Sequence, residues 1–178
     1  MGACARAARW QEAVALLAGC AQASVRPGTV CHNTVAAAHE RSHRWCDAVR
    51  LLGEMRHQAV LADAITYNSA VSACERARQW WHAVWLLADM RRHGLGQTLA
   101  AADCALRACG SGGAWGVALA VFEDALDGLL ACAEAAGTLW SAASWACQAS
   151  GVPPPPAPAP LRALARKQVA LLKHVWLQ

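Results

Sequence analysis

The sequence predicts an all-α protein, an α-α superhelix of stacked helix hairpins, and three observations lead to this prediction. Four tryptophans recur at intervals of 35 residues, each followed three positions later by alanine and then by an apolar pair: Trp10, Trp45, Trp80 and Trp115. Hydrophobic residues make up 56% of the 178 residues, and Ala and Leu, both strong helix formers, supply much of that share. Only one Tyr and one Phe are present, which disfavours a β-rich fold. Self-similarity at a fixed period indicates one structural unit copied along the chain.

The clearest unit is 64–98. Its first helix is expected over about 65–76, with the hydroxyl of Thr66 as its N-terminal cap. The second helix is expected over about 80–92, where apolar residues follow the i, i+3, i+4, i+7 spacing of a buried stripe. Gly94 follows as a stop signal. Each unit is therefore predicted to be a helix hairpin, which needs its neighbours to bury its apolar face.

The same plan extends in both directions. Residues 29–63 form a second complete unit, and residues 99–133 form a degenerate one that keeps the tryptophan and the apolar pair but loses the charged turns. Residues 1–28 hold a partial unit with a complete second helix only. Because the array begins in the middle of a unit, we expect the chain to be a fragment of a longer array.

After residue 133 the period weakens. Residues 134–150 are expected to form a residual helix, 151–160 a stiff proline-rich linker, and 161–178 a basic amphipathic helix. We interpret the linker as a spacer in preference to a ligand for a proline-binding domain. A cap on the last apolar face explains the final helix better than contact with a membrane or a partner protein. No apolar run approaches the roughly 20 residues that span a bilayer.

Charge is distributed unevenly along the chain. The net charge is +4, made up of +4 over residues 1–107, −4 over 108–160 and +4 over 161–178. A basic repeat region favours an anionic partner such as nucleic acid. An ordinary solvated surface explains the same charges about equally well.

The residue types that carry catalysis or bind metals show no suitable pattern. Nine cysteines are an odd number without a CxxC pair, and no His/Cys cluster has the spacing of a zinc site. Cys74 and Cys109 hold equivalent positions of two units and are expected to pack as reduced thiols. A Gly-rich phosphate loop, a Ser nucleophile motif and a carboxylate pair are also lacking. We therefore expect neither an enzyme nor a cofactor.

The segments ITYNSAVSACERARQWWHAVWLLADMRRHGL and CHNTVAAAHERSHRWCDAVRLLGEMRHQAV resemble pentatricopeptide repeats of the 35-residue type. The specific marks are the period, the pair Tyr67-Asn68 near the start of a first helix, and the Trp-x-x-Ala…Leu-Leu…Met pattern of the second helix. The resemblance covers roughly residues 1–126 and implies a right-handed solenoid. The Leu-Gly and Tyr signature of the related tetratricopeptide family is absent. Runs of Ala-Cys-Glu and Gln-Trp also resemble the large repeat sets of some algae.

The resemblance implies that the chain binds single-stranded RNA, with one base recognised by each repeat. Two pairs of residues match the family's base-reading positions: Asn33 with Asp63, a combination typical of uracil, and Asn68 with Thr98, which suggests a pyrimidine. An amide suits a pyrimidine edge because it offers both a donor and an acceptor. The resemblance further implies organellar RNA processing or stability, in a chloroplast or mitochondrion, although no transit peptide is visible; otherwise the protein is expected in the cytoplasm.

Two more positions follow from the same resemblance. Val30 and Ile65 match the places whose apolar side chains sandwich the bases. In the third unit, Asp103 and Ala133 stand at the base-reading positions, and no base is assigned there.

A column of arginines repeats with the same period: Arg6, Arg41 and Arg76. They are expected at the ends of first helices, where the planar guanidinium groups can contact successive phosphates. Helix C-termini also attract cations for purely structural reasons. A stacked base contributes about 1–3 kcal/mol, so two intact units alone are expected to bind RNA weakly.

The alternative function is a protein-interaction scaffold of stacked helix hairpins without nucleic-acid binding. Additional tryptophans support it, because Trp is frequent at interfaces: Trp81, Trp85, Trp140 and Trp145. We expect most of them to be buried between hairpins, and burial of Trp81 and Trp85 would weaken the alternative.

Overall fold

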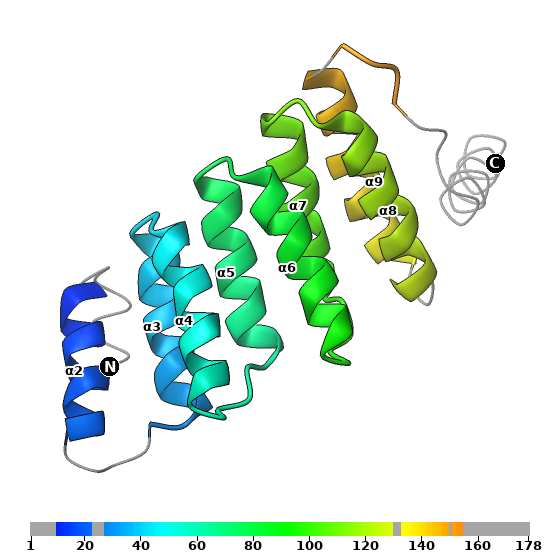
Figure 1. Ribbon diagram of the computed structural model, residues 1–178. Helices are drawn as coiled ribbons and strands as arrows, with labels where there is room; N and C mark the ends of the chain where they lie inside the picture. Colours follow the sequence, from blue (N-terminus) through cyan, green and yellow to red (C-terminus); the bar gives the residue numbers. More distant parts are fainter. Residues whose placement is uncertain (1–9, 23–26, 130–132, 150, 155–178) are drawn as a thin grey trace, which may run out of the picture.

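The computed structural model describes residues 10–22, 27–129, 133–149 and 151–154, and this part of the chain contains helices and no strand (Figure 1). The helices are α2 (Trp10–Gln22), α3 (Thr29–Arg41), α4 (Trp45–His57), α5 (Ala64–Arg76), α6 (Trp80–Arg92), α7 (Leu99–Ser111), α8 (Trp115–Leu129) and α9 (Ala133–Ala149). The predicted all-α superhelix is confirmed. None of the described helices is long and apolar enough to span a bilayer. The predicted positions of Arg6, of linker residues 155–160 and of the helix over 161–178 lie outside the described residues.

The helices form two layers (Figure 1). The first helices of successive hairpins, α3, α5, α7 and α9, pack directly against one another. The second helices α4, α6 and α8 pack instead on the first helix of their own hairpin and on that of the next. Because the first helices approach one another more closely than the second helices do, they line the inner side of the superhelix.

The repeated apolar positions form the core. The alanine that follows each tryptophan is buried in every hairpin, and the apolar pairs of α4 and α6 are buried with it: Ala13, Ala48, Ala83, Ala118, Leu51, Leu52, Leu86 and Leu87. Trp45 and Trp80 pack against this core, and Trp115 is 43% exposed. Small alanines and branched leucines therefore fill the space between the layers, and the tryptophans cover its edge.

Most of the helices end in the same way. After α3 the backbone amide of Arg44 donates to the carbonyl of His39, and that of His43 donates to Glu40. This Schellman pattern needs a left-handed residue just beyond the helix. His43, Arg78 and Gly113 fill that place after α3, α5 and α7, with φ of 55°, 58° and 71°. The left-handed conformation thus recurs with the 35-residue period, although the type of residue that adopts it changes.

One buried polar network joins α4, α5 and α6. The hydroxyl of Tyr67, a side chain that is 1% exposed, donates to the carboxylate of Asp89 at 2.8 Å. Arg56 donates both to Tyr67, at 3.2 Å, and to Asp89. Tyr67 of the Tyr67-Asn68 pair therefore has a structural role, because it fixes one hairpin against the next.

The two cysteines at equivalent repeat positions are buried. Burial raises the pKa of the Cys74 thiol to about 12 and that of Cys109 to about 11. Both thiols are therefore neutral at physiological pH and pack as small apolar groups.

Candidate nucleic-acid interface

The fold brings the members of each predicted base-reading pair together, although 30 positions separate them in sequence. The amide nitrogen of Asn33 donates to both carboxylate oxygens of Asp63, at 3.1 and 3.0 Å. In the next unit, the hydroxyl of Thr98 donates to the amide oxygen of Asn68 at 2.6 Å. In both units the Asn is the fifth residue of a first helix, and its partner is the last residue of the unit. Each pair therefore lies where two adjacent first helices begin.

The residue that closes a unit also caps the next first helix. Asp63 has an extended backbone and accepts a hydrogen bond from the amide of Thr66 at 2.9 Å, while the Thr66 hydroxyl accepts one from the amide of Asp63. Thr98 likewise accepts from the amide of Ala101 at 3.1 Å. The prediction that Thr66 caps this helix was wrong, because Asp63 holds the N-cap position and Thr66 completes the capping box from inside the helix.

Asp63 carries a negative charge into this site. Its partial burial opposes ionisation, but hydrogen bonds from the Thr66 amide and the Asn33 side chain outweigh burial, and the pKa of Asp63 falls below its usual value. The Thr66 hydroxyl also contacts the Asn33 amide oxygen. The amide plane of Asn33 is therefore fixed, and its oxygen and nitrogen have a defined orientation before any ligand arrives.

The two predicted sandwich residues are exposed apolar side chains beside these pairs. Val30 is 79% exposed and Ile65 is 61% exposed, each in the first turn of its helix. Leu61 in the intervening loop is 87% exposed, and its carbonyl accepts a hydrogen bond from the Thr29 hydroxyl at 3.0 Å. Leu61 could not be predicted from the repeat pattern, because the equivalent positions of the neighbouring units are Arg26 and Gly96.

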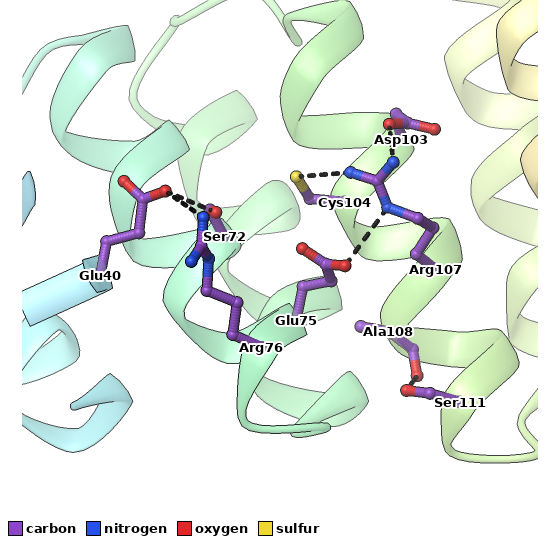
Figure 2. Close-up of polar contacts among 9 residues, drawn as sticks. All are labelled: Glu40, Ser72, Glu75, Arg76, Asp103, Cys104, Arg107, Ala108 and Ser111. Atoms are coloured by element: carbon purple, nitrogen blue, oxygen red, sulfur yellow. Dashed lines mark hydrogen bonds and ion pairs between the residues drawn. The ribbon is translucent and has the colours of Figure 1, made fainter. Parts of the chain in front are cut away.

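The third unit is built differently at the same positions. Asp103, the fifth residue of α7, pairs with Arg107 of its own helix at 2.9 Å (Figure 2). Arg107 also reaches Glu75 of the preceding first helix at 3.3 Å. At the sandwich position this unit has Ala100.

The arginine column lies at the other end of the first helices. Arg76 is 3.6 Å from the carboxylate of Glu40, which also accepts a hydrogen bond from the Ser72 hydroxyl at 2.8 Å (Figure 2). Arg41 is exposed. The free energy of exposed ion pairs is small, so Arg76 can exchange Glu40 for a phosphate at low cost.

Three of the four additional tryptophans are exposed, contrary to the expectation that most are buried. Trp81 is 63%, Trp85 40% and Trp145 48% exposed. The reason on α6 is that Ala83, Leu86, Leu87 and Met90 already form its buried stripe, so the two tryptophans four residues apart face outward.

Among the described residues no group of His, Cys, Asp or Glu side chains is arranged to hold a metal ion. What the geometry offers instead is a series of hairpins, two of which carry an oriented amide beside an exposed apolar side chain. These features define an α-solenoid of helical repeats.

The comparisons with known proteins identify the type of repeat. Residues 65–95 match the family of the PPR repeat, and no curated protein sequence matches the chain. The crystal structure of the pentatricopeptide repeat protein PPR10 from maize superposes with a TM-score of 0.65 and 26% sequence identity, covering 86% of this chain and 24% of PPR10. PPR10 in complex with an 18-nt psaJ RNA element matches at a TM-score of 0.58 and 24% identity, over 79% of this chain and 24% of that one. Residues 65–95 are therefore a PPR repeat, the described helices share the fold of PPR10, and the chain spans about a quarter of the length of PPR10.

Proposed function

We propose that the chain binds single-stranded RNA along its layer of first helices, with one base at each of the units 29–63 and 64–98. The observation that carries the proposal is the pairing of Asn33 with Asp63 and of Asn68 with Thr98. A PPR10 structure in complex with an 18-nt RNA element supports the same function for this fold.

The oriented amides suit pyrimidine bases. The edge of uracil presents a donor and acceptors, and an Asn amide has complementary atoms for both. Asp63 and Thr98 keep acceptor capacity on the same edge, because carboxylate and hydroxyl oxygens have more than one lone pair. A base placed against either amide also meets an exposed apolar side chain, Val30 or Ile65, that can pack on its face.

The arginines supply the phosphate contacts in this proposal. Arg41 and Arg76 lie one repeat apart, so they can follow the backbone of a strand that advances one base per repeat. Arg6 holds the preceding place in the column.

Two intact units give weak binding when they act alone. Each recognised base contributes about 1–3 kcal/mol, from which the cost of association must be subtracted. Strong binding would therefore need further repeats beside these two. The resemblance to pentatricopeptide repeats extends the proposal to an organellar transcript, in its processing or stability, in a chloroplast or mitochondrion.

The test is a titration of labelled uridine-rich and purine-rich RNA against the wild type and the double variant Asn33→Ala/Asn68→Ala. We expect the wild type to prefer uridine-rich RNA and the double variant to lose that preference. Gln79→Ala serves as a matched control, because it removes an amide at the opposite end of the hairpins. Equal, salt-insensitive binding in all cases would contradict the proposal.

A protein-interaction scaffold is the second candidate, favoured by the exposure of Trp81 and Trp85 on the outer layer. Sedimentation of the wild type and of the variant Trp81→Ser/Trp85→Ser separates the two functions. Self-association that the variant abolishes, together with no RNA binding by the wild type, would favour the scaffold.

A further inference from the structure

We propose that Trp145 forms an additional stacking site for an unpaired nucleobase, in the groove between α7 and α9 and away from the two Asn pairs. The proposal rests on the proposed RNA-binding function and extends it to a part of the chain where the base-reading pairs are absent. The juxtaposition that carries it is an exposed indole ring beside an ion-paired arginine and carboxylate and two hydroxyl groups on the layer of first helices.

Position along the helix places Trp145 on the same side as the base-reading residues. Thr138 lies 35 residues after Asp103, which itself stands one period after Asn68. Trp145 follows Thr138 by seven residues, or about two helical turns, so it lies on the same face about 10 Å further along the axis. Trp145 and Thr138 line one groove together with Asp103 and Arg107.

Gly110 on α7 leaves room for the indole ring. In the two earlier units the equivalent residues are Glu40 and Glu75, whose carboxylates pair with arginines of the next first helix. Gly110 takes that place in the third unit, and a Cβ atom there would lie 2.7 Å from Cζ3 of Trp145. One edge of the ring therefore rests on the backbone of α7, while the side chain remains 48% exposed.

The groove has the size and the polar groups for a base. Its volume is 790 Å³, and Trp145 also borders a second hollow of 640 Å³ beside Arg78 and Ser111. Volumes of this order accommodate small ligands. Arg107 is held in place by Asp103 at 2.9 Å and by Glu75 at 3.3 Å, and Arg78 donates to the carbonyl of Ser111 at 2.7 Å.

A nucleobase is the occupant that this combination fits. Single-strand binding sites combine aromatic rings, on which bases of any type stack, with arginines that accompany the backbone. The hydroxyls of Thr138 and Ser141 and the carboxylate of Asp103 can meet the edge of a stacked base. A strand that runs along the first helices from Asn33 to Asn68 continues toward this groove, since α7 and α9 follow in the same layer.

The experiment compares Trp145→Ala, Trp145→Phe and the control Trp81→Ala, which removes an exposed ring from the outer layer. Labelled RNA that is long enough to extend beyond the Asn pairs is titrated by fluorescence anisotropy. We expect Trp145→Ala to weaken binding about tenfold, Trp145→Phe to restore most of the affinity, and Trp81→Ala to leave it unchanged. The salt dependence should be the same in all variants, because the ring contacts a base and not a phosphate.

A second measurement separates this proposal from the one on which it rests. The indole N–H resonance of Trp145, assigned through Trp145→Phe, should shift when RNA is added to the Asn33→Ala/Asn68→Ala variant. A shift that persists there supports the stacking site, whatever the two Asn residues do. Unchanged affinity of Trp145→Ala together with an unshifted indole overturns the stacking site alone, even if the Asn pairs bind RNA. An absence of binding by the wild type overturns both proposals.

Discussion

The units 29–63 and 64–98 share their buried pattern with the unit 99–133 and differ from it in the polar contacts of the first helices. All of them place their first helices 35 residues apart and bury the same alanine and apolar pair. In the first two, an Asn on the first helix is hydrogen bonded to the residue that closes the unit. In the third, Asp103 pairs with Arg107 of its own helix. The apolar positions that form the hairpin core are thus distinct from most of the residues of the proposed ligand site, and the core pattern persists where the site residues change.

The contacts between neighbouring first helices show the same division. Glu40 and Glu75 make ion pairs with the helix that follows, whereas Gly110 lets Ala146 and Trp145 approach the backbone of α7. At this repeat position, polar and exchangeable contacts therefore join the earlier units, and close steric packing joins α7 to α9.

Gly110→Ala tests this contrast and should have the largest effect. The new Cβ would lie 2.7 Å from Cα of Ala146, a backbone atom that a side-chain rotation does not relieve. We expect a loss of about 1–3 kcal/mol in the free energy of unfolding, although Gly→Ala in a helix otherwise stabilises by up to about 1 kcal/mol.

The measurement is urea denaturation followed by circular dichroism. Glu75→Ala, at the equivalent position of the preceding unit, is the control and should cost less than about 1 kcal/mol. Equal effects of the two substitutions would remove the distinction between polar and steric contacts.

Asp63→Ala should have the next largest effect, because Asp63 caps α5 in addition to its place in the proposed ligand site. Loss of the cap and of the bond to Asn33 is expected to cost about 0.5–2 kcal/mol. Asp103→Ala breaks only an ion pair with the 45% exposed Arg107 side chain and should cost less. Thermal unfolding of both variants gives the comparison, and a cost for Asp103→Ala that equals or exceeds that for Asp63→Ala would be inconsistent with it.

The sequence predicted the fold better than the surface. The period placed the start of α6 at Trp80 and predicted its end near Arg92, because the sequence pattern repeated in each unit encodes the helix, its buried stripe and its turn. The pairing of Asn33 with Asp63 was not visible in spacing alone, since it depends on the approach of two first helices. Most of the additional tryptophans were expected to be buried between hairpins, but Trp81 and Trp85 are exposed because smaller side chains fill the core side of α6.

The turn residues offer a smaller test of the common geometry. His43 and Gly113 occupy the same left-handed place, with φ of 55° and 71°. Because glycine adopts this conformation without strain, we expect His43→Gly to stabilise and Gly113→Ala to destabilise, each by roughly 0.5–1 kcal/mol. Chemical denaturation measures both, and His57→Gly, at the last residue of α4, should destabilise as a control. Effects of the same sign for His43→Gly and Gly113→Ala would show that the two turns are not equivalent.

The smallest expected effect is a loss of stability in acid, and it separates the unit 29–63 from the units 64–98 and 99–133. His39 is 3% exposed, 6.1 Å from the ring of Trp10, and Cys74 and Cys109 hold its place in the later units. Burial lowers the pKa of His39 below its ordinary value of 6.5, assisted by the nearby Arg44 and Arg50 and opposed by Asp47. The unfolded chain therefore binds a proton at His39 more readily than the folded chain does. The contribution of neutral His39 to the free energy of unfolding is complete above pH 6.5 and declines as the pH falls from there through the folded pKa.

Urea midpoints measured on either side of pH 6.5 should fall less in His39→Cys than in the wild type, while His57→Gln, at an exposed position, should follow the wild type. Identical profiles for the wild type and His39→Cys would mean that this interface accepts a charged imidazole as readily as water does.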